Sequence, residues 1–252
     1  MSESISVKNI NKSFTTESSE IIVDGKRPAP VTRQVLKNLS LSFEEGKINV
    51  ILGRSGCGKS TLLRILHGTE EPDCGEVCIP QDWHSSLLSA EPYVITWTTL
   101  KHNIEMSAGA GRTQEERSAL ADKLLKAVHL DSFSDMTPAA LSTGMKQRLG
   151  LARVLAGRSE LLLMDEPFAS LDFITREELQ QELLAIQADM QRTIILVTHQ
   201  LDEALILADN ITIMQENGGI AKFDLSDFPK PRDISLPELK SLGTEIKEAC
   251  RA

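Results

Sequence analysis

Glycines, a lysine and hydroxyl side chains lie together in one nine-residue stretch at the spacing that phosphate binding requires. Glycines let the backbone curl until several N–H groups point at one anion, and the N-terminus of a following helix adds a positive partial charge. The Lys59 ammonium would then reach the β- and γ-phosphates, and the Ser60 hydroxyl would coordinate Mg²⁺. We therefore predict a nucleotide site formed by Gly53, Arg54, Ser55, Gly56, Cys57, Gly58, Lys59, Ser60 and Thr61.

Two adjacent carboxylates supply a second part of the predicted site. Asp165 and Glu166 follow the apolar run 161–164. In a parallel sheet ligands gather at the carboxyl ends of the strands, which places these acids beside the phosphate loop. Asp165 suits the Mg²⁺ shell, and Glu166 is able to accept a proton from an attacking water. Two acids after a strand are also ordinary turn residues, but the phosphate loop favours the functional interpretation.

Three weaker signals accompany these two. His199 ends the apolar run 194–198 and is able to hydrogen-bond a γ-phosphate, although a histidine at a strand end is commonly just a polar cap. Phe14 either stacks on a nucleotide base or only packs a strand end. A helix start with anion-binding geometry, which is also a common helix cap, is formed by Ser142, Thr143, Gly144 and Met145.

The elements that must position these residues follow from hydrophobic patterning. The apolar run 48–52 predicts a buried strand, and residues 62–66 begin a helix. The buried runs 161–164 and 194–197, separated by an amphipathic helix over 176–190, predict a parallel sheet covered on both faces. Alternating strands are expected over 6–10 and 35–43, joined by a long polar hairpin excursion over 15–34, and a turn over 71–77 leads into a short strand.

The stretch 80–96 has no clear period, whereas helices are expected over 113–130 and 145–156. The helical stretch interrupts the alternation of strand and helix, which indicates an inserted subdomain. We predict an α/β fold with a mixed-sheet core, an N-terminal antiparallel β part and an inserted helical subdomain. One domain over 1–252 would then comprise a nucleotide-binding core (1–96 and 159–222), the helical subdomain (97–158) and a C-terminal extension (223–252).

Composition excludes several classes. The net charge of −9 and pI near 5.2 disfavour binding of nucleic acid or anionic lipid. No apolar run approaches the ~18 residues of a membrane span, and the N-terminus lacks a secretory signal, so a cytoplasmic location is expected. Four cysteines are too few for a disulfide framework. Cys74 and Cys78 have no second pair or nearby histidine cluster, so thiols are favoured over metal ligands.

The motifs, in their order, make the chain resemble the ATP-binding subunit of ABC transporters, with a P-loop NTPase fold of the ABC ATPase type. The resemblance covers essentially the whole length. Its motifs, in order, are a Walker A loop (53–61), a signature motif (141–145), a Walker B strand (161–166), a D-loop (Ser170, Leu171, Asp172) and a switch histidine (His199). The resemblance implies an ATPase with ATP and Mg²⁺ as cofactors, an A-loop aromatic at Phe14, and contact of Asp172 and the signature motif with nucleotide.

The same resemblance implies partners and a location. Two such subunits meet head to tail, each signature motif closing over the ATP held by the other. Permease subunits bind the pair at the inner face of the cell membrane, and a substrate-binding protein acts indirectly. Within the family the chain looks like the nitrate/sulfonate/taurine importer class, on the form of residues 165–172 and of the late segment 228–238.

Two residues depart from the family pattern. Family members carry a glutamine after a strand, about seven residues before a Trp-x-Thr pattern, and counting back from Trp97 reaches Ala90. A register that uses Gln81 instead leaves too little chain for the intervening strands. Thr143 replaces a glycine of the signature motif. We hypothesise that ATP binding survives while hydrolysis, or its coupling to transport, is weakened.

Two alternative functions remain at this stage. One is a degenerate regulatory subunit that mainly binds ATP, which Ala90 and Thr143 motivate and the intact Glu166 and His199 oppose. The other is a soluble ABC protein of DNA repair or translation, which would normally carry two cassettes or a long coiled coil. The transported solute, and whether the pair is a homodimer or a heterodimer, stay open.

Overall fold

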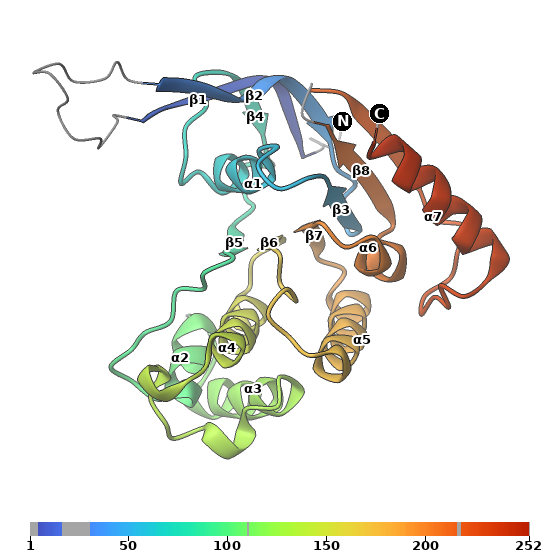
Figure 1. Cartoon of the computed structure of the whole chain (residues 1–252). Coiled ribbons are helices and arrows are strands. Elements are labelled where there is room, and N and C mark those ends of the chain that lie inside the picture. The colour runs from blue at the N-terminus through green and yellow to red at the C-terminus, as the bar shows by residue number, and fades with distance from the viewer. Residues whose placement is uncertain (1–4, 17–30, 110, 216–217, 252) are drawn as a thin grey trace, which may run out of the picture.

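Two β-sheets organise the chain in the computed structural model, which describes residues 5–16, 31–109, 111–215 and 218–251. An antiparallel sheet has the strand order β2-β1-β4, and a six-stranded sheet has the order β5-β6-β7-β3-β8-β9 (Figure 1). The strands are β1 (Ser6–Thr16), β2 (Val31–Ser42), β3 (Ile48–Leu52), β4 (Cys74–Cys78), β5 (Ser85–Leu88), β6 (Leu161–Asp165), β7 (Thr193–Thr198), β8 (Asn210–Met214) and β9 (Ile220–Asp224).

Seven α-helices and two short 3₁₀ turns are found in the described ranges. The helices lie on both sides of the six-stranded sheet, and none of them is both long and apolar enough to cross a membrane. They are α1 (Lys59–His67), α2 (Leu100–Ser107), α3 (Gln114–Ala127), α4 (Thr143–Ala156), α5 (Phe173–Met190), α6 (Leu201–Leu207) and α7 (Pro237–Ala249), with 3₁₀ turns at Asp131–Phe133 and Pro138–Ala140.

The central strands of the large sheet are parallel and buried on both faces. β3, β6 and β7 consist mostly of apolar residues, and every residue in them is buried. Within the large sheet, as far as the structure describes it, β9 alone runs antiparallel to its neighbour, β8. Because helices cover both faces of a parallel sheet, such strands read as continuous apolar runs. The mixed sheet, the antiparallel N-terminal sheet and the inserted helices confirm the predicted fold class.

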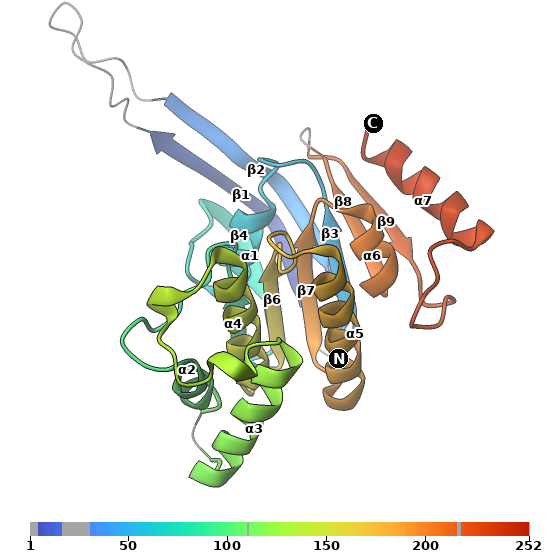
Figure 2. The same cartoon turned by 60° about the horizontal axis from the view of Figure 1, so that its bottom comes forward.

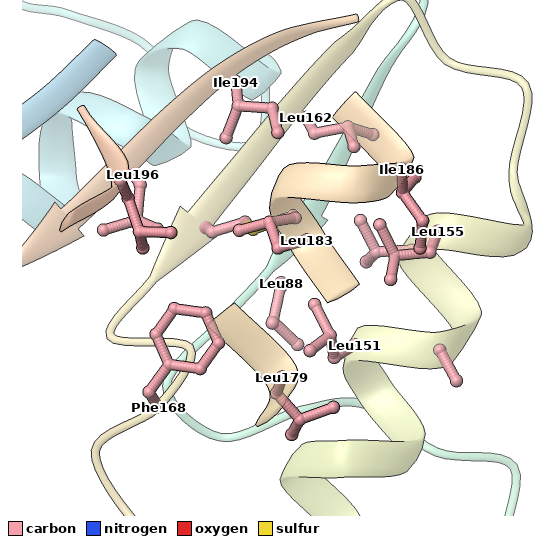
Figure 3. Packing of buried hydrophobic residues seen from close by; sticks show 14 of the residues in the cluster. Leu88, Leu151, Leu155, Leu162, Phe168, Leu179, Leu183, Ile186, Ile194 and Leu196 are labelled. Carbon is pink, nitrogen blue, oxygen red and sulfur yellow. The ribbon is translucent and has the colours of Figure 1, made fainter. Parts of the chain in front are cut away.

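Alternate residues of these strands divide the core into two clusters, one on each face. Leu162, Ile194 and Leu196 pack against α4 and α5 (Figure 3), together with residues such as Leu151 and Leu183. Their neighbours in sequence face α1 and the antiparallel sheet instead. At about 25 cal/mol per Å² of apolar surface, this two-sided burial is the main favourable term that holds the strand ends, and hence the site, in place.

The helical segment between residues 97 and 158 lies to one side of the large sheet (Figures 1 and 2). Its helices begin at side-chain caps, since Thr99 accepts from the His102 amide and Thr113 forms a capping box with Glu116. α7 packs against α6 at the opposite edge, and β9 runs across the expected start of the C-terminal extension. The boundaries of the core, the helical subdomain and the C-terminal extension stay a prediction.

Several element bounds differ from the sequence-based expectation. β1 continues to Thr16 and β2 starts at Val31, and these two residues pair across the sheet, whereas residues 17–30 of the expected excursion lie outside the described residues. β5 was not predicted, because its pairing with β6 is made across more than seventy residues of chain. α5 begins at Phe173 rather than at residue 176, since Asp172 caps it.

Candidate functional site

The phosphate loop connects β3 directly to α1, and its glycines are required by close approach. Gly56 and Gly58 have φ of 86° and 100°, which side-chain-bearing residues rarely adopt. A Cβ on Gly58 would lie 2.5 Å from Leu36 Cδ2, and one on Gly53 would lie 2.5 Å from the Met214 carbonyl oxygen. The loop is therefore packed against β2 on one side and the end of β8 on the other.

Lys59, the first residue of α1, is almost fully buried. Its Nζ donates to the carbonyl oxygens of Gly53 (2.7 Å) and Arg54 (2.9 Å), so the side chain folds back across the loop. The Cys57 side chain packs in the hydrophobic cluster beneath the loop, and its Sγ lies 3.9 Å from Lys59 Nζ.

Asp165 ends β6 and lies beside Ser60. Burial raises the pKa of the Asp165 carboxyl, while the hydrogen bond from the Ser60 side chain opposes that shift. A hydroxyl and a carboxylate side by side are the oxygen ligands that Mg²⁺ prefers, and a nearby cation would favour the charged form of this buried acid. The donor set present therefore fits Mg²⁺.

Glu166 is held in an unusual backbone conformation next to His199. Its φ is 49°, in the left-handed region that costs a non-glycine residue of order 1–3 kcal/mol unless the surroundings fix it. The Glu166 amide donates to the Val197 carbonyl (2.9 Å) and Gln147 Nε2 donates to the Glu166 carbonyl (3.4 Å). His199 Nδ1 lies 3.0 Å from Glu166 Oε1. A carboxylate only accepts, so in this contact Nδ1 carries the proton.

The strand order explains why the two acids and the histidine meet. β6 and β7 are parallel neighbours in which Asp165 pairs with Val197, so both strands end at the same edge of the sheet. Behind them Glu203, only 3% exposed, accepts a hydrogen bond of 2.6 Å from Thr198 Oγ1. Burial raises the pKa of the Glu203 carboxyl. This buried acid was not singled out in the sequence, where it is one of many helical glutamates.

A cleft of about 460 Å³ is lined by half of the predicted site residues, whereas His199 lines a neighbouring cavity. Arg33 and Val35, which the sequence analysis did not single out, also line the cleft; no local motif marks them, and only the pairing of β2 with β1 brings this part of β2 here. Gly53 and Arg54 line a neighbouring cavity that ends at α7. The cleft is lined by Phe14, Arg33, Val35, Ser55, Gly56, Gly58, Lys59, Ser60, Thr61, Ala90, Asp165 and Glu166.

Ala90 follows β5 and lines this same cleft. Gln81 is exposed, precedes β5 and does not line it. The geometry therefore favours the register that assigns Ala90 to the position after the strand. Ala90 therefore places a methyl group in the cleft, at the position where the family pattern has a glutamine side chain.

The residues of the second anion-binding candidate lie elsewhere. Ser142 caps α4 by accepting from the Met145 amide (3.3 Å), and a Cβ on Gly144 would lie 2.9 Å from the Ser170 carbonyl oxygen. None of Ser142, Thr143, Gly144 and Met145 lines the cleft. Asp172 is exposed and caps α5, and the Thr175 backbone N–H that it accepts lowers its pKa. Both helix starts therefore lie outside the cleft of their own chain.

Comparison with known proteins places these features in a family. A family model described as ABC transporter matches residues 36–169. The chain is 36% identical over 242 residues to the aliphatic sulfonates import ATP-binding protein SsuB 1 of Shouchella clausii, covering 96% of this chain and 89% of that protein. It is also 36% identical over 241 residues to the bicarbonate transport ATP-binding protein CmpD of Synechocystis, covering 91% and 81%.

Solved structures agree with the sequence relatives. The dimeric ATP-binding cassette MJ0796 bound to ADP and Pi in a post-hydrolysis state is 27% identical, with a TM-score of 0.74 over 88% of this chain and 98% of that one. A second dimeric structure of the same cassette, described as a bacterial ABC transporter cassette, gives the same values.

Proposed function

The chain belongs to the ATP-binding subunits of ABC transporters, and from this premise we propose that it drives the import of a small oxyanion of the sulfonate, nitrate or bicarbonate kind. As a member of that family it is an ATPase that forms dimers and acts with membrane permease subunits. The single observation that carries the solute class is the 36% identity, over nearly the whole chain, to importer subunits named for aliphatic sulfonates and for bicarbonate.

ATP binding is assigned to the cleft that contains the phosphate loop. The loop amides and the N-terminus of α1 supply fixed partial positive charge. Lys59 adds a full positive charge, and on ATP binding its ammonium would exchange its hydrogen bonds to two loop carbonyls for hydrogen bonds to phosphate oxygens. Ser60 and Asp165 would hold Mg²⁺, which offsets phosphate charge when bound. Phe14, 37% exposed at the mouth of the cleft, is placed to stack on the base.

Glu166 and His199 are assigned to the attacking water. Glu166 takes the proton as the base, and its left-handed backbone aims the carboxylate from the end of β6 into the cleft. His199 donates from Nδ1 to Glu166, which orients the carboxylate. In the imidazolium form, which carries a proton on both nitrogens, Nε2 also donates to a γ-phosphate oxygen. The short contact between them supports an active enzyme over a degenerate regulatory subunit.

A second copy would complete the nucleotide site. The capped starts of α4 and α5 carry Ser142, Thr143 and Asp172 on the surface, outside the cleft of their own chain. In a symmetric pair each start is available to the nucleotide held by the other chain, so ATP favours the closed pair because it contacts both copies only there. The pair would lie at the inner face of the membrane beneath the permease, with a substrate-binding protein delivering the anion.

Ala90 and Thr143 are proposed to lower hydrolysis or its coupling to transport. Ala90 supplies no amide to position water, and Thr143 adds a side chain at a helix start that would approach phosphate. Loss of one positioning group typically costs about 10- to 1000-fold in rate.

Anion uptake in the source organism tests this function. A strain lacking the chain should lose uptake of one labelled anion among taurine, alkanesulfonate, nitrate and bicarbonate. The wild-type chain, and Lys37→Gln as a control outside the cleft, should restore that uptake, whereas Lys59→Ala should not. Unchanged uptake of all four anions would favour a soluble, non-transport ABC ATPase instead.

A further inference from the structure

The nucleotide cleft contains a second cation that none of the assigned roles uses. The positively charged side chains lining the cleft are Lys59 and Arg33, set against the carboxylates of Asp165 and Glu166. Arg33 lies on β2, far from any nucleotide motif in the sequence. Its guanidinium Nη2 approaches the Gly56 carbonyl oxygen at 3.5 Å, a long hydrogen bond.

Strand pairing fixes Arg33 between the base-stacking aromatic and the phosphate loop. Arg33 and Phe14 are Cα partners across the antiparallel β1–β2 pair, so their side chains share one face of the sheet. Two residues further along β2, Val35 and Leu36 touch the loop at Gly58, where a Cβ would lie 3.0 Å from the Val35 carbonyl oxygen. β2 is therefore packed against the loop directly after Arg33.

The guanidinium has unused capacity for an anion. Arginine presents five N–H donors in a planar fork that matches phosphate oxygens in pairs, and it stays charged at all physiological pH values. Arg33 is exposed, and among the described residues its guanidinium makes one hydrogen bond, the long one to Gly56. Lys59, by contrast, is buried and reaches its ligand only by releasing two loop carbonyls.

We propose that Arg33 is a nucleotide-contacting residue that donates to the phosphate oxygens nearest the ribose. This inference rests on the proposed nucleotide site. A base stacked on Phe14 and a terminal phosphate at Lys59 would run the nucleotide past the loop at Gly56, where the guanidinium lies. Arg33 then increases affinity for ATP and ADP alike, and affects KM more than kcat.

Calorimetric titration with ADP and Mg²⁺ tests this contact on the purified chain. Arg33→Gln should raise the Kd for ADP about tenfold, the loss expected for one charge-assisted hydrogen-bonded contact. Arg33→Lys keeps the charge but loses the planar fork, so its Kd should lie between those of the wild type and Arg33→Gln. Arg33→Gln should also weaken the dependence of Kd on salt concentration, because one screened attraction is gone. Lys37→Gln makes the same charge change on an exposed residue of β2 outside the cleft, and should leave Kd unchanged.

Any of the following results would contradict the proposed contact between Arg33 and the nucleotide. A wild-type Kd in Arg33→Gln would mean that the guanidinium is only solvated, and an equal loss in Lys37→Gln would mean that overall charge, not a contact, sets affinity. Equal weakening in Arg33→Lys and Arg33→Gln, with a lowered melting temperature, would assign Arg33 to loop stability. Failure of the wild-type chain to bind ADP would instead refute the nucleotide site itself.

Discussion

His199 Nδ1 lies 3.0 Å from Glu166 Oε1, although thirty-three residues separate the two in the chain. The contact joins the ends of two parallel strands, and Glu166 reaches it from a left-handed backbone conformation. A strained residue held by surrounding hydrogen bonds next to a histidine is the arrangement expected where a proton is transferred.

Glu166→Gln should lower steady-state ATP hydrolysis by about 10²-fold or more, since the amide cannot accept the proton of water. His199→Ala should lower it as well by removing the group that orients the carboxylate. Binding of ADP should stay near the wild-type value in both, because neither change touches the phosphate loop. Glu177→Gln, on the exposed face of α5, is the control and should retain full activity. Full hydrolysis by Glu166→Gln would remove Glu166 from the mechanism.

Ala90→Gln should raise kcat, because Ala90 is exposed in the cleft and an amide there can position water. The expected gain is about tenfold, the low end of what one positioning group contributes. Gln81→Ala tests the alternative in which Gln81 is the glutamine of the family pattern. It should leave kcat unchanged, because Gln81 lies outside the cleft. Comparison of kcat at saturating ATP measures both. An unchanged kcat in Ala90→Gln would argue against the proposal that Ala90 weakens hydrolysis.

Two inactive chains should complement each other when mixed. Lys59→Ala disables the phosphate loop, and Ser142→Asp brings a negative charge to the start of α4 while keeping a good helix cap. If each α4 start acts on the nucleotide of the other copy, a mixed pair has one intact site, and an equal mixture should recover about a quarter of wild-type activity. Each variant alone should be inactive in the same ATPase assay. No recovery in a mixture shown to exchange subunits would place both residues in one chain's own site.

Phe14 substitutions should separate base stacking from strand packing. Base–aromatic stacking is worth about 1–3 kcal/mol, so Phe14→Leu should raise the KM for ATP at least fivefold, whereas Phe14→Tyr should keep it near the wild-type value. Lys12 Nζ lies 5.2 Å from the centroid of the ring, so the base would take the other face. Equal KM values for Leu and Tyr would support simple packing of the strand end.

The stability of the chain should depend on pH through Glu203. Burial raises the pKa of this carboxyl, so between the ordinary glutamate range and the raised value the folded state binds more protons than the unfolded state. The contribution of Glu203 to stability therefore falls as pH rises through that window. Glu203→Gln lacks the titration, so the difference in unfolding free energy, variant minus wild type, should grow in favour of the variant from pH 4.5 upward. Urea unfolding at a series of pH values measures it, and a difference that shrinks with rising pH would contradict the assignment.

Much of the site follows from local sequence. The buried strand, the glycine-rich loop and the helix start at Lys59 are neighbours in the chain, and their residue types leave few backbone conformations open. The same holds for the caps at Ser142 and Asp172. β5, the end of β1 and the start of β2 were not predicted, since short or polar strands are stabilised by partners distant in sequence.

The sequence by itself determined which chemical groups are present: a phosphate loop, paired carboxylates, a histidine, and an alanine in place of an amide. Only the tertiary structure decided which of them meet. Parallel pairing of β6 with β7 joins Glu166 to His199, and the β1–β2 register puts Arg33 beside Phe14, while the starts of α4 and α5 stay outside the cleft. Local conformation depends on neighbouring residues, but these meetings depend on burying apolar strand faces across long stretches of chain.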